Sequence, residues 1–301
     1  MSSLDCPVCE TSGTPLLEGV TDYHVAQDKA FDVQYCSHCF NGFSLPKMSE
    51  RDLKPFYTEQ YEAYQPRTGF LGWIQRTKYR MDIKLISEVA PPKSNLYEIG
   101  AGRGEFLREA KEKGFKVAGL EPSPIGRQFA KEHFQIELQD MSASQLNLAE
   151  PVDVVVARHV VEHVNEPHEL LKHILDRCLR PEGTLFLKIP NFASWERKLF
   201  GKYWAGWDLP RHRFHFSPQG IEHLLLSIGY KDIQVRDEIV PSAIVWSIGH
   251  VARHCNQPLL KTLFKLVNAL PKPALVLAAQ MLAVIMAPFK AGRMIVIARK
   301  A

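Results

Sequence analysis

Residues 96–107 read LYEIGAGRGEFL, and this stretch decides the fold. Its apolar start predicts a strand, Asn95–Ile99, and its end predicts a helix, Glu105–Lys113. The turn between them contains three alternate glycines: Gly100, Gly102 and Gly104. Glycines let a backbone bend sharply and approach a ligand closely, because no Cβ stands in the way. The stretch therefore predicts a strand–loop–helix unit that binds a ligand at its loop.

Two acids flank this glycine loop. Glu98 lies just before the first glycine, and Glu121 directly follows the next predicted strand, Lys116–Leu120. An acid about 20 residues beyond such a loop accepts hydrogen bonds from ribose hydroxyls in nucleotide-binding folds. The spacing G-x-G-x-G differs from the G-x-G-x-x-G of a dinucleotide fold. A ribose-containing ligand is the stronger interpretation, and ordinary turn glycines beside a helix-capping acid are the alternative.

From residue 73 onward, helix and strand patterns alternate. Ser123-Pro124 and Ser217-Pro218 each predict a helix start, because serine caps a helix and proline fits its first turn. The predicted helices are Trp73–Val89, Glu105–Lys113, Ser123–His133, Leu170–Leu179 and Ser217–Ile228. The predicted later strands are Ile136–Leu138, Val152–Ala157, Gly183–Ile189, Asp232–Ile239 and Arg293–Arg299. This alternation predicts βαβ units, and hence an α/β fold with a mostly parallel sheet that has helices on both faces.

The cysteines predict a metal site near the N-terminus. Four of the six form two C-x2-C pairs: Cys6, Cys9, Cys36 and Cys39. Thiols of a cytoplasmic protein stay reduced, so the pairs favour a structural Zn2+ site with four thiolates over disulfides. Buried thiols or a redox motif are the alternative. We predict a zinc-ribbon-like domain over residues 1–45 and a linker rich in proline and glycine over residues 46–72.

Composition and charge exclude some classes of protein. With 301 residues, of which 46% are apolar, the chain can bury a core, and wholesale disorder is excluded. Residues 1–60 carry nine acids and four bases, which suits phosphate poorly, so no nucleic-acid partner is expected. Residues 241–301 carry eight Lys/Arg and no acid. This asymmetry indicates a contact with a surface or a membrane near the C-terminus.

Residues 240–292 form a long insert before the last strand. Pro273 and Pro288 enclose fourteen residues, almost all apolar, and as a helix these would reach only ~21 Å, short of the ~30 Å hydrocarbon core of a bilayer. The insert therefore predicts in-plane or re-entrant attachment to anionic lipid. Packing on its own sheet or on a second subunit is the alternative. Met1–Glu10 resembles no signal peptide, so we expect a cytoplasmic protein attached peripherally to the inner face of the membrane.

The glycine loop and its acids resemble those of class I S-adenosylmethionine-dependent methyltransferases. The motif E-x-G-x-G-x-G occupies Glu98–Gly104, and Asp153–Val164 and Leu179–Ile189 add to the resemblance. The resemblance implies a methyltransferase domain over residues 73–301. It also implies a Rossmann-like sheet of seven strands, with Arg293–Arg299 as the last strand.

The same resemblance implies that the cofactor is S-adenosyl-L-methionine. The loop would approach its methionine and ribose parts, Glu121 would hold the ribose, and Asp140 and Met141 would lie at the adenine. The implied cofactor-binding residues are Glu98, Gly100, Gly102, Gly104, Glu121, Asp140, Met141 and Arg158.

Three histidines are candidates for a catalytic base, which an oxygen or carbon acceptor requires. His159 and His163 follow the strand Val152–Ala157, and His215 lies in the loop 206–216, which is rich in His, Arg and aromatic residues. As alternatives, Glu162 and His163 only cap a helix, and the loop is an aromatic lid.

The segment from His159 to His163 also resembles ubiquinone-biosynthesis O-methyltransferases, whose E-x-x-E-H arrangement holds magnesium. Here the first acid is His159, and imidazole is a poor magnesium ligand, so no catalytic metal is predicted.

Three functions are compatible with the sequence. A zinc-binding domain ahead of such a core resembles nucleotide-sugar C-methyltransferases and their relatives in polysaccharide gene clusters. We therefore expect an enzyme that methylates a sugar-containing or lipid-linked acceptor in envelope or polysaccharide biosynthesis. A quinone or natural-product O-methyltransferase is the first alternative. A non-enzymatic zinc-ribbon adaptor with a degenerate methyltransferase core is the second.

Overall fold

The computed structural model describes residues 5–23, 29–56, 69–286 and 288–301. The chain divides into two compact units. Unit 1 comprises Met1–Phe56, Ile189–Leu224 and Val235–Ile295, and unit 2 comprises Tyr57–Lys188, Leu225–Gln234 and Val296–Ala301. Residues 57–68 of the predicted linker lie outside the described residues. The predicted domain limits at residues 45 and 73 stay predictions.

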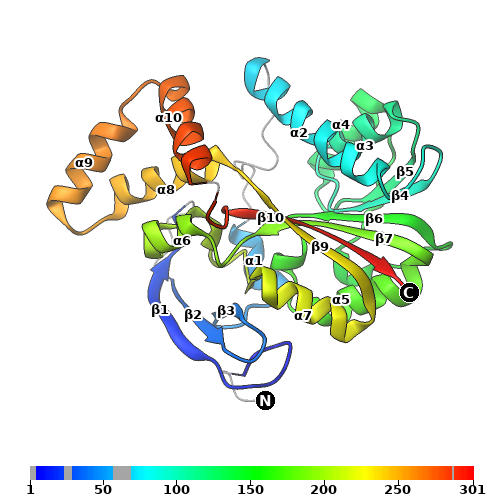
Figure 1. Cartoon of the computed structure of the whole chain (residues 1–301), viewed down its shortest axis with the longest axis horizontal. Coiled ribbons are helices and arrows are strands. Elements are labelled where there is room, and N and C mark those ends of the chain that lie inside the picture. Colours follow the sequence, from blue (N-terminus) through cyan, green and yellow to red (C-terminus); the bar gives the residue numbers. More distant parts are fainter. Residues whose placement is uncertain (1–4, 24–28, 57–68, 287) are drawn as a thin grey trace. The chain divides into compact units, whose positions relative to one another are not determined.

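The larger sheet has six strands in the order β5-β4-β6-β7-β10-β9, and most of it belongs to unit 2 (Figure 1). Its strands are β4 (Asn95–Ile99), β5 (Lys116–Leu120), β6 (Val152–Arg158), β7 (Leu179–Pro190), β9 (Tyr230–Glu238) and β10 (Arg293–Lys300). The pairs β4–β5, β4–β6 and β6–β7 are parallel. The interior of β6 is fully buried, as a continuous apolar run predicts for a central parallel strand.

Helices cover both faces of this sheet in unit 2. Figure 1 shows α2 (Gly69–Ser87), α3 (Glu105–Glu112) and α4 (Pro124–Phe134) on one side and α5 (Pro167–His173) on the other. The Ser123 hydroxyl accepts a hydrogen bond from the Gly126 amide, so the predicted cap begins α4. α5 continues into a π-helical turn, Ile174–Cys178, and β7 then begins four residues earlier than the predicted Gly183. The α/β fold with a mostly parallel sheet is confirmed.

The predicted number of strands was wrong by one among the described residues. Ile136–Leu138 is not a strand, and only a single parallel bridge forms there, between Leu120 and Gln139. α4 runs on to Phe134, and Gln135 then turns with a φ of 50°. The chain therefore meets the edge of the sheet only beside Leu120, the last residue of β5. A single bridge forms there, and no ladder of strand hydrogen bonds follows. The sheet has six strands instead of seven.

Unit 1 contains a second sheet, with four strands in the order β1-β2-β3-β8. Its strands are β1 (Thr14–Thr21), β2 (Ala30–Cys36), β3 (Asn41–Leu45) and β8 (Phe214–His215), and the neighbours are antiparallel. β8 comes from the stretch predicted as a loop, and it pairs with β3 through Gly42 and Phe43. The stretch before β8 also contacts the N-terminal part of unit 1, residues 5–23. Arg211 is fully buried and donates to Asp22 and Asp208.

The remaining helices of unit 1 lie before β8 and in the insert. They are α1 (Glu50–Leu53), α6 (Trp195–Phe200), α8 (Pro241–His254), α9 (Pro258–Asn268) and α10 (Lys272–Ile285), while α7 (Pro218–Ile228) is shared with unit 2. Among the described residues, no single helix is long and apolar enough to cross a membrane. α9 and α10 meet that criterion together, as a pair bent by 112°.

Candidate methyl-donor site and four-cysteine centre

The glycine loop after β4 has the backbone that only glycine adopts easily. Gly100, Gly102 and Gly104 have φ values of 68°, 55° and 72°. A Cβ at Gly100 would lie 2.8 Å from a methyl of Val160, and one at Gly104 would lie 2.9 Å from the Cβ of Ala130. A Cβ at Gly102 would meet no atom within 4 Å. The first and last glycines therefore allow close packing, and the middle one leaves space at the loop for a ligand.

Glu121 joins the end of β5 to this loop. Its Oε2 accepts a hydrogen bond from the Gly102 amide at 2.7 Å, and its Oε1 accepts one from the Ser123 amide at 2.8 Å. Burial raises the pKa of Glu121, and the two amides counteract this shift. Each carboxylate oxygen has a second lone pair, so both oxygens can still accept hydrogen bonds from a diol. The geometry suits the predicted role at a ribose.

Glu98 and Arg158, both predicted to bind the cofactor, pair with each other. Arg158 donates through Nε and Nη2 to Oε1 of Glu98, at 2.9 and 2.7 Å, and its guanidinium lies over the rings of Phe106 and Tyr79. Glu98 is fully buried, which raises its pKa, while Arg158 opposes the shift. Oε2 of Glu98 is buried without a hydrogen-bond partner among the described residues. A buried acceptor of this kind is costly unless a donor such as a ligand amine reaches it.

Sequence reasoning missed Tyr79 and Phe106, which hold Arg158 in place. Phe106 stands directly inside the quoted motif, and Tyr79 lies on the helix that precedes it, so both were visible as aromatic residues near the loop. Their rings also meet edge to face, with centroids 6.0 Å apart. They form an aromatic wall beside the Glu98–Arg158 pair.

Asp140 is held by Arg127, a third residue that the sequence analysis did not single out. Arg127 donates to Oδ2 of Asp140 at 2.8 Å and to the backbone oxygens of Glu121 and Pro122. The Asp140 side chain is 74% exposed, and Met141 is half-buried. Both side chains are therefore accessible to a ligand, and their contact with adenine stays a prediction.

His159 follows β6 directly and has an unusual backbone. Its φ is 57°, and its amide donates to the Lys188 carbonyl at 2.8 Å. Its Nδ1 lies 3.1 Å from Oε1 of Glu162, a buried carboxylate, while the imidazole stays 39% exposed. His163 closes the short 3-10 turn Val161–His163. The structure thus orients an accessible imidazole directly after β6, and the role of His159 as a base stays a prediction.

His215, in unit 1, lies in a different environment. It is almost fully buried on β8, its Nε2 lies 2.9 Å from the Ser44 hydroxyl, and its ring meets those of Phe192 and Trp207. Burial holds the pKa of His215 well below its usual value of 6.5, and the positive charge of Arg197 adds to the shift. Such a neutral, enclosed histidine suits packing of the ribbon sheet better than proton transfer to a substrate.

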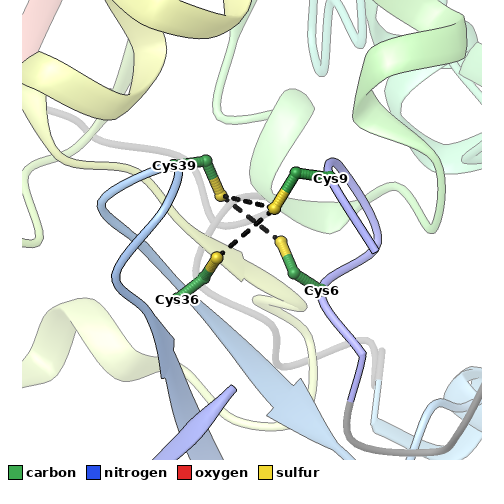
Figure 2. Close-up of side chains that lie close together, drawn as sticks. All are labelled: Cys6, Cys9, Cys36 and Cys39. Carbon is green, nitrogen blue, oxygen red and sulfur yellow. Dashed lines mark hydrogen bonds between the residues drawn. The ribbon is translucent and has the colours of Figure 1, made fainter. Parts of the chain in front are cut away.

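The four N-terminal cysteines converge in unit 1 (Figure 2). Their sulfurs lie 3.4 Å apart in the pairs Cys6–Cys39 and Cys9–Cys36, and 3.7 Å apart in Cys9–Cys39. A tetrahedral zinc with Zn–S bonds of about 2.3 Å places its sulfurs about 3.8 Å apart. None of the four forms a disulfide. The donor set and its spacing therefore fit zinc.

The four thiols also affect one another's acidity. The hydrogen bond between the Cys6 and Cys39 sulfurs lowers the pKa of Cys6 to about 5 and raises the pKa of Cys39. Burial raises the pKa of Cys36. Four adjacent thiolates repel one another, so all four ionise together only with a cation between them.

Comparison with known families identifies the larger fold. A sequence model of the methyltransferase domain family matches residues 72–235. An uncharacterized methyltransferase of Alkaliphilus oremlandii is 33% identical over 104 residues, which are 34% of this chain and 48% of that protein. A ubiquinone biosynthesis O-methyltransferase of Rhodopseudomonas palustris is 25% identical over 148 residues, 44% of this chain and 57% of the relative. The chain thus spans about half the length of these relatives.

The fold also resembles solved structures. Phosphoethanolamine N-methyltransferase 2 of Haemonchus contortus, solved with S-adenosyl-L-methionine, superposes with a TM-score of 0.53 and 16% identity. The match covers 92% of this chain and 70% of that one. At this identity the similarity concerns the fold alone.

Proposed function

This chain belongs to the methyltransferase domain family, and we propose that it transfers the methyl group of S-adenosyl-L-methionine to a sugar-containing or lipid-linked acceptor in envelope or polysaccharide biosynthesis. One observation carries the cofactor assignment. The left-handed glycine loop is held by Glu121 at the carboxyl ends of β4 and β5, which is where nucleotide-like ligands bind in open α/β sheets.

Unit 2 has a residue for each part of the cofactor. Glu98 would accept from the amino group through Oε2, Glu121 would accept from the ribose hydroxyls, and Gly102 would let the backbone approach. Asp140 and Met141 would lie at the adenine. When bound, S-adenosyl-L-methionine supplies a methyl group that is already activated on a positively charged sulfur. The protein's own contribution is then to align the acceptor and to remove its proton.

His159 is the residue that we assign to proton removal. Glu162 engages Nδ1, which favours the tautomer with the proton on that nitrogen and leaves Nε2 basic. The acceptor proton would pass to Nε2, which would leave the acceptor atom nucleophilic. The buried carboxylate of Glu162 stabilises the imidazolium that results.

The four-cysteine centre supports the fold of the ribbon and takes no part in this chemistry. Four thiolates fill a tetrahedral zinc ion and leave no open position for a substrate. The sugar-containing acceptor is supported by the resemblance to nucleotide-sugar methyltransferases, in which a zinc-binding domain precedes the core.

A second acceptor class is favoured by one specific observation, the similarity to a ubiquinone biosynthesis O-methyltransferase. A quinone precursor and a lipid-linked glycan share a long apolar tail and differ in the head that receives the methyl group. The acceptor must therefore be identified by experiment.

Two measurements test these assignments. Titration calorimetry of the full chain with S-adenosyl-L-methionine should show one site; no binding would overturn the proposal and favour a zinc-ribbon adaptor. Protein and methyl-labelled cofactor are then incubated with bacterial membrane extract, and the lipids are separated. Label in glycolipid supports a lipid-linked acceptor, label in quinone supports the second candidate, and label in neither overturns both of these lipid acceptors. Glu121→Ala serves as the control for label that does not depend on the site.

A further inference from the structure

The insert exposes an unusual number of large apolar side chains. On α9, Leu259 is 83% exposed and Leu266 is 67% exposed, and none of the residues of α9 is buried. On α10, Leu277 is 62% exposed and Ile285 is 70% exposed. We call the set the apolar face of the insert: Leu259, Leu263, Leu266, Leu270, Leu277, Met281, Val284 and Ile285. Along each helix these side chains follow one another mostly at three- or four-residue intervals, so they share a side, and exposed apolar patches mark interaction surfaces.

Packing within unit 1 already uses the other side of these helices. α10 buries Leu275, Ala279 and Ala283, which are four residues apart and share one side of the helix, and it packs against α8. α9 is anchored by Phe264, whose ring meets that of Phe200 edge to face at 6.4 Å. Figure 1 shows α9, in orange, leading away from α8, and α10, in red, turning back towards it. The opposite side of α10 is apolar where a fully solvated helix would be polar.

Charge narrows the choice of partner. From Pro241 to the end the chain carries eight Lys/Arg and no acid. Four of the lysines belong to the two helices or flank them: Lys261, Lys265, Lys272 and Lys290. Leucines combined with lysines and without acids complement a surface that is apolar inside and negative at its rim. The anionic face of a lipid bilayer has both properties.

The dimensions fit attachment rather than a span. α9 has 11 residues and α10 has 14, so the longer helix reaches only about 21 Å of a ~30 Å hydrocarbon core. Their axes bend by 112° at the break between them. A short, sharply bent pair places leucines among the upper acyl chains and leaves the lysines at the phosphates.

We propose that α9 and α10 form a membrane-docking surface, which inserts the apolar face of the insert into an anionic lipid leaflet. The proposal adds a partner to the protein and does not depend on methyl transfer, because lipid binding is measured without it.

Vesicle sedimentation tests this surface directly. The full chain is mixed with vesicles of phosphatidylcholine containing about one third phosphatidylglycerol, and with vesicles of phosphatidylcholine alone. We expect the anionic vesicles to carry the protein down and about 1 M salt to release part of it, because the Debye length then falls to ~3 Å. On binding, hydrogen exchange should slow in α9 and α10 and stay unchanged in α3 and α4.

Two variants with a matched control locate the contact. Leu263→Glu/Leu266→Glu should weaken partition about tenfold or more, since each leucine loses its burial in lipid. Lys261→Gln/Lys265→Gln should weaken binding to anionic vesicles only. Leu226→Glu is the control, because Leu226 is also an exposed leucine, 57% accessible, on α7. None of the variants replaces a buried residue, and their circular dichroism should match that of the wild type.

Three outcomes would overturn the proposal. In the first, the wild type is recovered unbound from both kinds of vesicle, and in the second, Leu226→Glu weakens binding as much as the leucine pair does. In the third, light scattering shows a dimer that Leu263→Glu/Leu266→Glu makes monomeric, with no lipid binding by either protein. The apolar face would then belong to a contact with a second copy of this chain.

Discussion

The four-cysteine centre of unit 1 and the glycine loop of unit 2 are both short sequence motifs, yet the chain prepares them differently. The four sulfurs lie within hydrogen-bond distance of one another, so their negative charges repel when they ionise. At the glycine loop, the chain supplies partners for its own acids. Glu121 accepts from two amides, and Glu98 is paired with Arg158.

The two regions therefore differ in whether they need a bound ligand in order to fold. A cluster of thiolates depends on its ion, because metal binding and folding are then one equilibrium. A loop whose charged side chains are paired within the chain can fold without its ligand. Only a few polar atoms of such a loop, such as Oε2 of Glu98, then lack a partner. Removing the ligand should therefore unfold the first region and leave the second intact.

The largest effect is expected at the four cysteines. Cys36→Ser/Cys39→Ser should abolish zinc binding and unfold residues 5–45, because structural zinc contributes apparent free energies of about 10–16 kcal/mol. Elemental analysis should find one zinc per wild-type chain and none in the variant. Hydrogen exchange should rise in β1, β2 and β3, while β4 and β6 stay protected. Freshly purified wild type without zinc, or a variant whose ribbon stays protected, would contradict the comparison.

The next largest effect concerns Arg158, the cation that the chain itself provides. Arg158→Met leaves Glu98 buried and unpaired, so unfolding free energy should fall by about 3–5 kcal/mol. Urea unfolding measures this loss. Glu98→Gln/Arg158→Met should recover much of it, because no buried charge then remains.

The same variant should show a characteristic dependence on pH. Burial raises the pKa of Glu98 in the folded protein, and Arg158 opposes the shift, so the pKa rises further without it. A carboxyl with a higher pKa when folded binds its proton more tightly in that state. Stability is therefore lost as pH rises from the unfolded value of about 4.3 through the folded one. Arg158→Met should be relatively most stable near pH 4, and equal stability with the wild type at neutral pH would show that Arg158 is not needed to balance Glu98.

These pairs also show what the sequence could and could not predict. The cysteine cluster and the glycine loop were predictable, because spacing within a few residues fixes their local geometry. The Glu98–Arg158 contact joins residues 60 apart, and it exists because β4 and β6 lie parallel with Glu98 beside Val156. No local pattern contains that register.

Two further elements depended on distant contacts in the same way. Phe214–His215 is a strand only because β3 lies beside it, so its local sequence suggested a loop. Ile136–Leu138 has strand-like residues, but α4 ends too close to it for a ladder to form. Local propensity is overridden in both cases by where the chain meets a sheet edge.

A third prediction compares one histidine from each unit. His159→Ala should lower kcat by about 10²- to 10⁴-fold, with little change in cofactor affinity, since a positioned base contributes this much. His215→Ala should instead lower the melting temperature, because it removes a buried ring that contacts Ser44, Phe192 and Trp207. Steady-state kinetics with the acceptor that the labelling experiment identifies measure the loss of kcat, and thermal unfolding measures the loss of stability. If His215→Ala abolishes turnover in a stably folded protein, the base belongs to unit 1.

The smallest effect is expected at Glu121, whose carboxylate accepts hydrogen bonds from two amides of the chain and, in our proposal, from the ribose as well. Glu121→Ala should weaken cofactor binding about 10- to 100-fold, as expected for the loss of a charge-assisted hydrogen bond. Glu137→Gln is the matched control, because Glu137 is an acid outside the proposed site whose side chain is 79% exposed, and it should change the affinity less than about twofold. Titration calorimetry measures both.

Glu121→Gln then separates the role in the loop from the role at the ligand. Glutamine keeps one oxygen for the Gly102 or Ser123 amide but loses the charge. If Glu121 acts on the ribose, Glu121→Gln should melt close to the wild type and still bind the cofactor weakly. If Glu121 only braces the loop, the alanine variant should melt early and glutamine should restore both stability and affinity. In that case Glu98, rather than Glu121, would be the carboxylate that binds the cofactor.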